Sequence, residues 1–114
     1  MIKSTGEFAK STVSNLRGGV GDLTRIDIFN QDEMLKKARV CAIFSFPAGA
    51  SIGDHSHGPE AEIYYILSGS FRITDNGITK DLSVGDAVFT GGGNSHSIIN
   101  IGDTEASLLA IVIN

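Results

Sequence analysis

The sequence predicts a single all-β domain whose short strands close into a sandwich or a barrel. Three observations lead to this fold class. The 114 residues match the size of one domain. Fourteen glycines and two prolines divide the chain into short segments. A hydrophobic content of 41% is enough for a packed core.

Each element is predicted from the residues that compose and bound it. Residues 1–21 are polar and end in the glycine-rich stretch Arg17–Gly21, so they are predicted to form an N-terminal arm before a barrel domain over residues 22–114. Alternation and β-prone composition predict eight or nine short strands. They cover residues 23–29, 40–46, 51–57, 61–67, 71–74, 78–82, 87–90, 95–101 and 106–113.

Two local motifs refine this assignment. Asp75-Asn76-Gly77 joins two predicted strands and is a strong β-hairpin signal. Asn30 and Glu33 have the spacing of a capping box, in which each side chain accepts a hydrogen bond from the backbone N–H of the other residue. Residues 31–38 are therefore predicted to form one or two helical turns, the only helix expected in the chain.

Composition excludes several classes of partner. The net charge of −4 is spread without a basic stripe, which disfavours nucleic acid as a partner. The longest apolar stretch, Ala106–Ile113, is too short to span a bilayer, and residues 1–10 lack the apolar segment of a signal peptide. The single cysteine, Cys41, cannot form an internal disulfide. We therefore expect a cytoplasmic protein with neither a nucleic-acid nor a membrane partner.

All three histidines of the chain fall in two glycine-bounded blocks, residues 49–62 and 91–100. Side chains two apart on a strand point the same way, so His55 and His57 are predicted to project side by side. Glu62 begins the next strand after a short turn and returns opposite the two imidazoles. His96 lies on a later strand and has to be brought in by tertiary folding.

These four residues are predicted to bind one metal ion. Alternation would place them on a face otherwise lined with apolar residues, where burying polar groups unpaired costs several kcal/mol. A metal ion or a tight hydrogen-bond network would remove that cost, and imidazole and carboxylate are common ligands of divalent transition metals. The alternative is that they are isolated polar residues at strand ends.

The spacing of these blocks resembles the two sequence motifs of the cupin superfamily. The first runs from Gly49 through the histidine pair and Glu62 to Gly69, and the second runs from Gly85 through His96 to Asn100. Fifteen residues separate them. One departure is Gly91, where the second motif commonly has proline; this position shapes a turn and is not a ligand.

The resemblance implies a double-stranded β-helix, or jelly roll, in which His55, His57, Glu62 and His96 hold one ion. In detail the chain is similar to small single-domain cupins related to oxalate-binding and oxalate-decarboxylase-like proteins. This similarity rests on the segments Glu62–Ile66 and Gly93–Ile98.

The ligand set constrains the metal and what it binds. Three neutral imidazoles and one carboxylate leave a divalent ion with about one positive charge. Manganese or iron, which are favoured, and nickel or cobalt take six ligands and keep two positions open for a bidentate anion such as oxalate or a 2-oxo acid. Tetrahedral zinc, also possible, would be saturated.

Whether the site catalyses a reaction is left open by the sequence. Tyr64, on the face of Glu62, and Glu60, at the rim, are the candidate catalytic residues. The glutamate that oxalate decarboxylases carry on a mobile lid loop has no convincing counterpart. The alternatives are a metal-dependent dioxygenase or sugar-phosphate isomerase-like enzyme, and a non-catalytic ligand-binding or sensor protein.

A homodimer is expected as well. A polar N-terminal arm next to an exposed sheet edge favours strand exchange between two copies, because an unpaired edge tends to be covered. Residues 1–10 are the expected arm.

Overall fold

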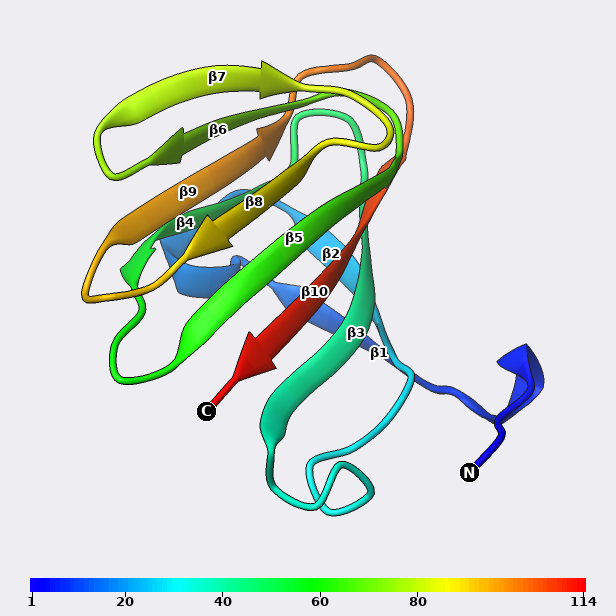
Figure 1. Cartoon of the computed structure of the whole chain (residues 1–114). Helices are drawn as coiled ribbons and strands as arrows, with labels where there is room; N and C mark the ends of the chain where they lie inside the picture. Colours follow the sequence, from blue (N-terminus) through cyan, green and yellow to red (C-terminus); the bar gives the residue numbers. More distant parts are fainter.

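The computed structural model describes residues 1–114 and confirms the predicted all-β, jelly-roll fold (Figure 1). From β3 onwards the chain passes back and forth between two antiparallel sheets, which is the winding of a double-stranded β-helix. The six-stranded sheet has the order β1-β2-β3-β10-β5-β8, and the four-stranded sheet has the order β4-β9-β6-β7. No helix of the chain has the length and apolar character needed to cross a membrane.

The observed strands follow the predicted ones closely, with one strand added near the N-terminus. Their bounds are β1 Ala9–Ser14, β2 Asp22–Asp27, β3 Ala38–Phe46, β4 Ser51–Ser56, β5 Ala61–Ser68, β6 Phe71–Asp75, β7 Ile78–Leu82, β8 Ala87–Thr90, β9 Ser95–Asn100 and β10 Ala106–Ile113. The β6–β7 hairpin turns at the predicted Asp75-Asn76-Gly77.

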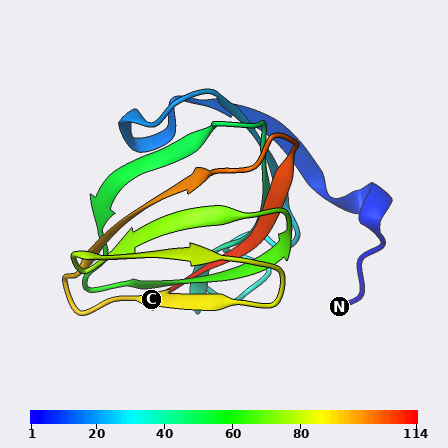
Figure 2. The ribbon, with the colours of Figure 1, turned by 90° about the horizontal axis from the view of Figure 1, so that it is seen from above.

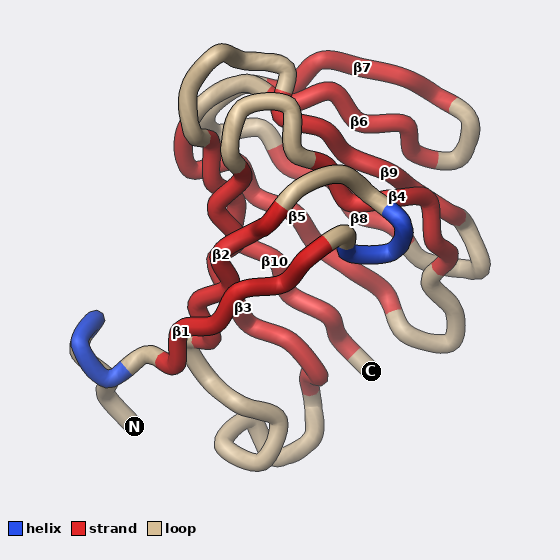
Figure 3. The backbone as a smooth tube through the Cα atoms, turned by 180° about the vertical axis from the view of Figure 1, so that it is seen from behind, coloured by secondary structure: helices blue, strands red, loops and turns tan.

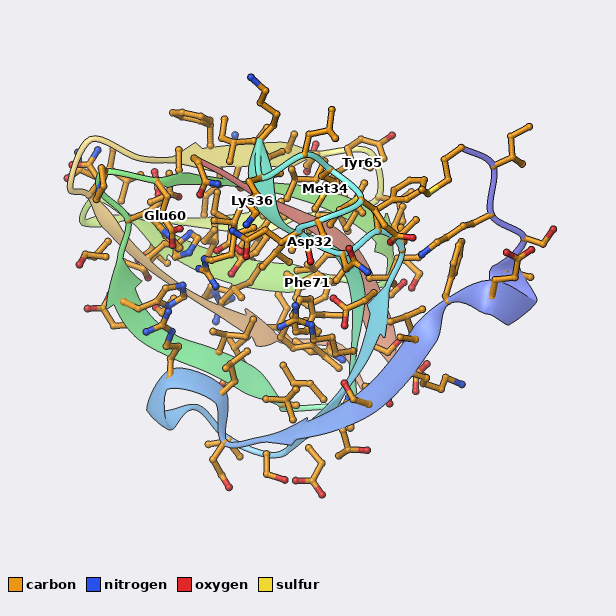
Figure 4. The ribbon with its side chains drawn as sticks, turned by 90° about the horizontal axis from the view of Figure 1, so that it is seen from below. Asp32, Met34, Lys36, Glu60, Tyr65 and Phe71 are labelled. Atoms are coloured by element: carbon orange, nitrogen blue, oxygen red, sulfur yellow. The ribbon has the colours of Figure 1, made fainter.

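The core lies between the two sheets and follows from strand alternation. In β3 and β10 every second side chain is buried, and these side chains face the inner side of the six-stranded sheet. Phe71 of β6 meets Phe46 of β3 edge to face, with ring centroids 5.0 Å apart. Phe71 lies in the interior, whereas Glu60 lies toward the margin of the barrel (Figure 4).

The predicted helix over residues 31–38 is wrong, although its capping box forms. The backbone N–H of Asn30 donates to Glu33 Oε1, and the N–H of Glu33 donates to Asn30 Oδ1, each over 2.8 Å. The segment nevertheless consists of turns, because Leu35 and Lys36 adopt left-handed φ angles of 55° and 58°. A right-handed helix cannot continue through two such residues.

The segment predicted as a polar arm, residues 1–21, contains two short 3₁₀-helices, η1 Thr5–Glu7 and η2 Leu16–Gly18, in addition to β1. β1 pairs antiparallel with β2 at the edge of the larger sheet. Its polar residues are mostly exposed, so alternation gave no signal for a strand there. The chain before β1 extends away from the barrel (Figures 2 and 3).

One buried side chain, that of Asn100 at the end of β9, fixes one end of the barrel. Asn100 is 1% exposed, and its amide N–H groups lie 2.9–3.2 Å from the carbonyl oxygens of Phe46, Pro47 and Thr104. Its Oδ1 accepts from the N–H of Gly102 over 2.9 Å. Asn100 therefore ties the end of β3 to the loop between β9 and β10.

We expect Asn100→Ala to lower the free energy of unfolding by roughly 2–4 kcal/mol, because buried backbone groups lose their partners. Urea denaturation followed by circular dichroism measures this change. Asn94→Ala, at an exposed side chain, is the matched control and should lie within about 0.5 kcal/mol of wild type. Equal stabilities of the two variants would contradict this role of Asn100.

Candidate metal centre

Four side chains converge at one point between the sheets, and we call them the His–Glu cluster: His55, His57, Glu62 and His96. The Nε2 atom of His96 lies 3.1 Å from the Nε2 atoms of both His55 and His57. Glu62 Oε1 lies 3.0 Å from Nε2 of His57 and of His96, and 3.6 Å from Nε2 of His55. The structure thus brings together all four residues that the sequence singled out.

Three strands and one loop position the cluster. His55 of β4 and His96 of β9 are paired across neighbouring strands, and Glu62 comes from β5 in the other sheet. His57 was predicted to be the last residue of the strand that carries His55, but β4 ends at Ser56 and His57 is the first residue after it. Its backbone is held instead by the 91–94 loop, through hydrogen bonds with Asn94 and Gly93.

A glycine makes this approach of loop and strand possible. A Cβ atom at Gly58 would lie 2.8 Å from the backbone nitrogen of Gly93, closer than real Cβ contacts come. The absence of a side chain at Gly58 therefore lets the loop reach the backbone of His57.

Hydrogen bonds at the far side of two rings set their tautomers. His55 Nδ1 lies 2.8 Å from the carbonyl oxygen of Gly53, which can only accept. His96 Nδ1 lies 2.8 Å from Thr90 Oγ1, whose hydroxyl donates in turn to Asp75. Both rings therefore carry a proton on Nδ1 and direct the Nε2 lone pair into the cluster, as metal-binding histidines do.

The donor set fits a divalent metal ion. Ligand atoms about 2.1 Å from a common ion are about 3.0 Å apart at right angles and about 3.4 Å apart in a tetrahedron. Five of the six pairs of ligand atoms are 3.0–3.6 Å apart, which covers this range, and all four atoms lie within 4.8 Å of one another. Imidazole lone pairs and a carboxylate that are packed this closely repel one another, and a cation between them removes the repulsion.

Titration of Glu62 points the same way. Burial raises the pKa of this carboxyl, but hydrogen bonds from His55 and His96, together with the charges of His96 and His57, lower it to about 2. Glu62 therefore attracts positive charge into the cluster, either as protons or as a metal ion.

His57 carries the one buried side-chain atom of the structure that has no hydrogen-bond partner, its Nδ1. Glu60 Oε1 lies 4.0 Å from this atom, beyond hydrogen-bond distance. Burial lowers the pKa of His57, which favours the neutral ring that a metal ion requires.

The two candidate catalytic residues, Tyr64 and Glu60, lie beside the cluster and differ in burial and in protonation. The fully buried ring of Tyr64 stacks on His96, with centroids 4.8 Å apart and planes 2° apart. Burial and the charge of Glu62 raise the pKa of Tyr64 well above its usual value, so the hydroxyl stays protonated. Glu60 forms two hydrogen bonds with Arg39, of 2.6 and 2.9 Å, which hold its pKa below the usual range. A carboxylate paired in this way is a weak base.

A small cavity of about 80 Å³ opens beside the cluster. It is far smaller than the pockets of drug-sized ligands, so it suits a ligand of a few atoms. Three of its lining residues are arginines, Arg17, Arg25 and Arg39. The sequence did not predict them as site residues, because no spacing motif connects them. The lining residues are Leu16, Arg17, Arg25, Arg39, Val40, Phe44, Ile52, His55, His57, Glu62, Tyr64 and Val112.

Comparison with known proteins shows the family and the fold to which this chain is similar. The family model described as "Cupin domain" matches residues 42–112. An oxalate-binding protein of Thermotoga maritima is 40% identical over 113 residues, which are 99% of this chain and 93% of the relative. The crystal structure of a predicted oxalate decarboxylase from Thermotoga maritima superposes with a TM-score of 0.94 at 40% identity, covering 99% of this chain and 98% of the other.

More distant structures share the fold alone. An RmlC-like cupin from Shewanella frigidimarina has a TM-score of 0.77 at 19% identity, with 97% of this chain and 87% of the other covered. The same architecture thus persists where little of the sequence does.

We expect Thr90→Val to weaken metal binding by about 10- to 100-fold, because His96 Nδ1 loses its buried acceptor and its ring orientation. Competition with a chelator of known affinity measures this. Thr104→Val, at an exposed side chain, is the control and should bind metal as the wild type does. Unchanged metal affinity of the Thr90 variant would refute the orienting role.

Proposed function

This chain belongs to the cupin family, and from that premise we propose that it binds a small anionic organic acid, such as oxalate or a 2-oxo acid, through one divalent metal ion in the His–Glu cluster. The convergence of four ligand atoms beside a small, arginine-lined cavity carries this proposal. The name of the 40% identical oxalate-binding protein supports the same class of ligand.

The charge of the cluster favours an anion. Three neutral imidazoles and Glu62 leave a divalent ion with about one positive charge, and a six-coordinate ion keeps two positions for a chelating ligand. Manganese or iron therefore suits the proposal best, nickel or cobalt is compatible with it, and a tetrahedral zinc ion would leave no position. When bound, the ion would supply electrostatic attraction for the acid and polarise it.

The residues of the chain itself favour binding over turnover. Tyr64 is a neutral, buried hydroxyl beside the cluster, so we propose that it donates a hydrogen bond rather than acting as a base. Glu60, the other candidate, is held by Arg39. These residues therefore favour a sensor or ligand-binding role, and decarboxylase, dioxygenase or isomerase activity is the alternative. We expect this role to be exercised in a reducing cytosol, given a single free cysteine.

The proposal is tested by metal analysis and oxalate titration of the purified protein. We expect about one manganese or iron ion per chain, and a change in its spectrum when oxalate is added. His96→Ala should lower metal retention by at least about 100-fold, because it removes the ring nitrogen closest to the other three ligand atoms.

Ser97→Ala changes the neighbouring residue of the same strand and serves as the control. Retention of metal by the His96 variant would refute the site. A metal spectrum that ignores excess oxalate and 2-oxo acids would refute the ligand class.

We also propose that the outer face of the six-stranded sheet is covered by a second copy of this chain. A sheet with one face in water shows apolar residues inside and polar residues outside, whereas the outward positions of β10 and β5 are mostly apolar as well. Leu109 and Ile111 pair with Tyr65 and Ile63, and Ile63 pairs with Phe89 of β8. Tyr65 is 43% and Phe89 63% exposed, so this apolar surface lacks a cover within one copy.

In a two-fold dimer the same patch of both copies meets, and an apolar patch without opposed charges can pair with itself in this way. Light scattering during size exclusion should then give twice the chain mass of 12.0 kDa for the wild type. Tyr65→Glu should shift the protein toward monomer, while Ile78→Glu, at a 69% exposed site on the other sheet, should leave it dimeric. A wild type that is monomeric at high concentration would refute the dimer.

A further inference from the structure

Three arginines line the cavity beside the His–Glu cluster, but only one is free to bind a ligand. Arg25 makes hydrogen bonds of 2.9–3.1 Å to both carboxylate oxygens of Asp27. Arg39 is held by Glu60 over 2.6 Å. Arg17 has neither an ion pair nor a side-chain hydrogen bond in the structure. Arg17 is therefore the one arginine lining this cavity that has no acidic partner.

The backbone of Arg17 is held in an unusual conformation. Its φ of 55° lies in the left-handed region, which a non-glycine residue with a long side chain seldom adopts. The Asn15–Gly21 loop around it is closed by two backbone hydrogen bonds of 3.0 Å, from Asn15 to Gly21 and from Gly18 to Asn15. Strain of this kind persists only where the surrounding structure enforces it, and it is concentrated at ligand sites.

The same loop is clamped to β4, the strand that carries His55. Val20 donates to Ser51 Oγ and accepts from the backbone N–H of Ser51, each over 2.9 Å. A Cβ atom at Gly53 would lie 2.1 Å from the carbonyl oxygen of Arg17, so the backbones touch there. The position of Arg17 relative to the cluster is thus fixed by the strand that supplies a ligand.

We propose that Arg17 binds the oxygens of the chelated ligand that face away from the metal site, and that it thereby selects dicarboxylates over monocarboxylates. This inference rests on the proposed function and gives it a specificity-determining residue.

The charges explain the selection. A divalent ion in the cluster retains about one positive charge, which a monocarboxylate neutralises. A dianion such as oxalate brings one further negative charge into the cavity, where an unpaired charge is costly. Arg17 supplies the second positive charge, and its planar guanidinium can meet the two outward oxygens of a chelated oxalate with two parallel hydrogen bonds. Arg25 and Arg39 would first have to leave their partners.

The test compares oxalate with acetate on manganese-loaded protein by calorimetric titration. Arg17→Gln should weaken oxalate binding by about 10- to 100-fold and change acetate binding by less than about threefold, because only the dianion uses the guanidinium. Arg17→Lys should keep part of the oxalate affinity, since it keeps the charge but not the two-pronged geometry. Manganese content, read independently, should remain at the wild-type level in both variants.

Arg72→Gln removes an arginine that is paired with Asp81 on the other sheet, and it should bind both acids as the wild type does. Oxalate affinity that survives Arg17→Gln refutes the role of Arg17 alone. An equal loss of oxalate and acetate, or a loss of manganese, refutes the selection and indicates damage to the loop. A wild type that holds manganese but binds no oxalate refutes the proposed function together with this inference.

Discussion

The crowding of three imidazole nitrogens around one carboxylate oxygen is the constraint on which the rest of the site depends. Atoms of this kind repel one another at about 3 Å unless a proton or a metal ion lies between them. The jelly roll holds them there because His55 and His96 are paired across adjacent strands, while Glu62 reaches them from the opposite sheet. The barrel thus stores an electrostatic cost that a cation relieves.

The surroundings of the cluster make that arrangement specific. Gly53 and Thr90 accept from Nδ1 of two rings, which fixes the tautomer needed for a metal ligand, and Asp75 in turn orients Thr90. The ring of Tyr64 stacks on the ring of His96 and covers one face of it. The cavity beside the cluster is small and is lined by three arginines, of which only Arg17 lacks an acidic partner.

Strand positions could be predicted closely because alternation and turn composition are local signals. The β7, β8 and β10 strands have the predicted bounds, and the hairpin at Asp75–Gly77 forms as expected. β1 was missed because an edge strand with both faces in water does not alternate. The helix after Asn30 was wrongly predicted because its capping box, also a local signal, forms in a turn as well as in a helix. Leu35 and Lys36 then adopt left-handed φ angles, which end any right-handed helix.

The sequence by itself determined the all-β architecture and the four residues of the cluster, because ligand-type side chains at fixed strand spacing are visible along the chain. Only the tertiary structure decided which ring nitrogens face inward, that Arg39 forms an ion pair with Glu60, and that Arg17 has no acidic partner. Those facts depend on contacts between residues far apart in the chain, such as Arg17 with Gly53 or Thr90 with Asp75. No local pattern encodes such contacts, since they arise only when the two sheets close on each other.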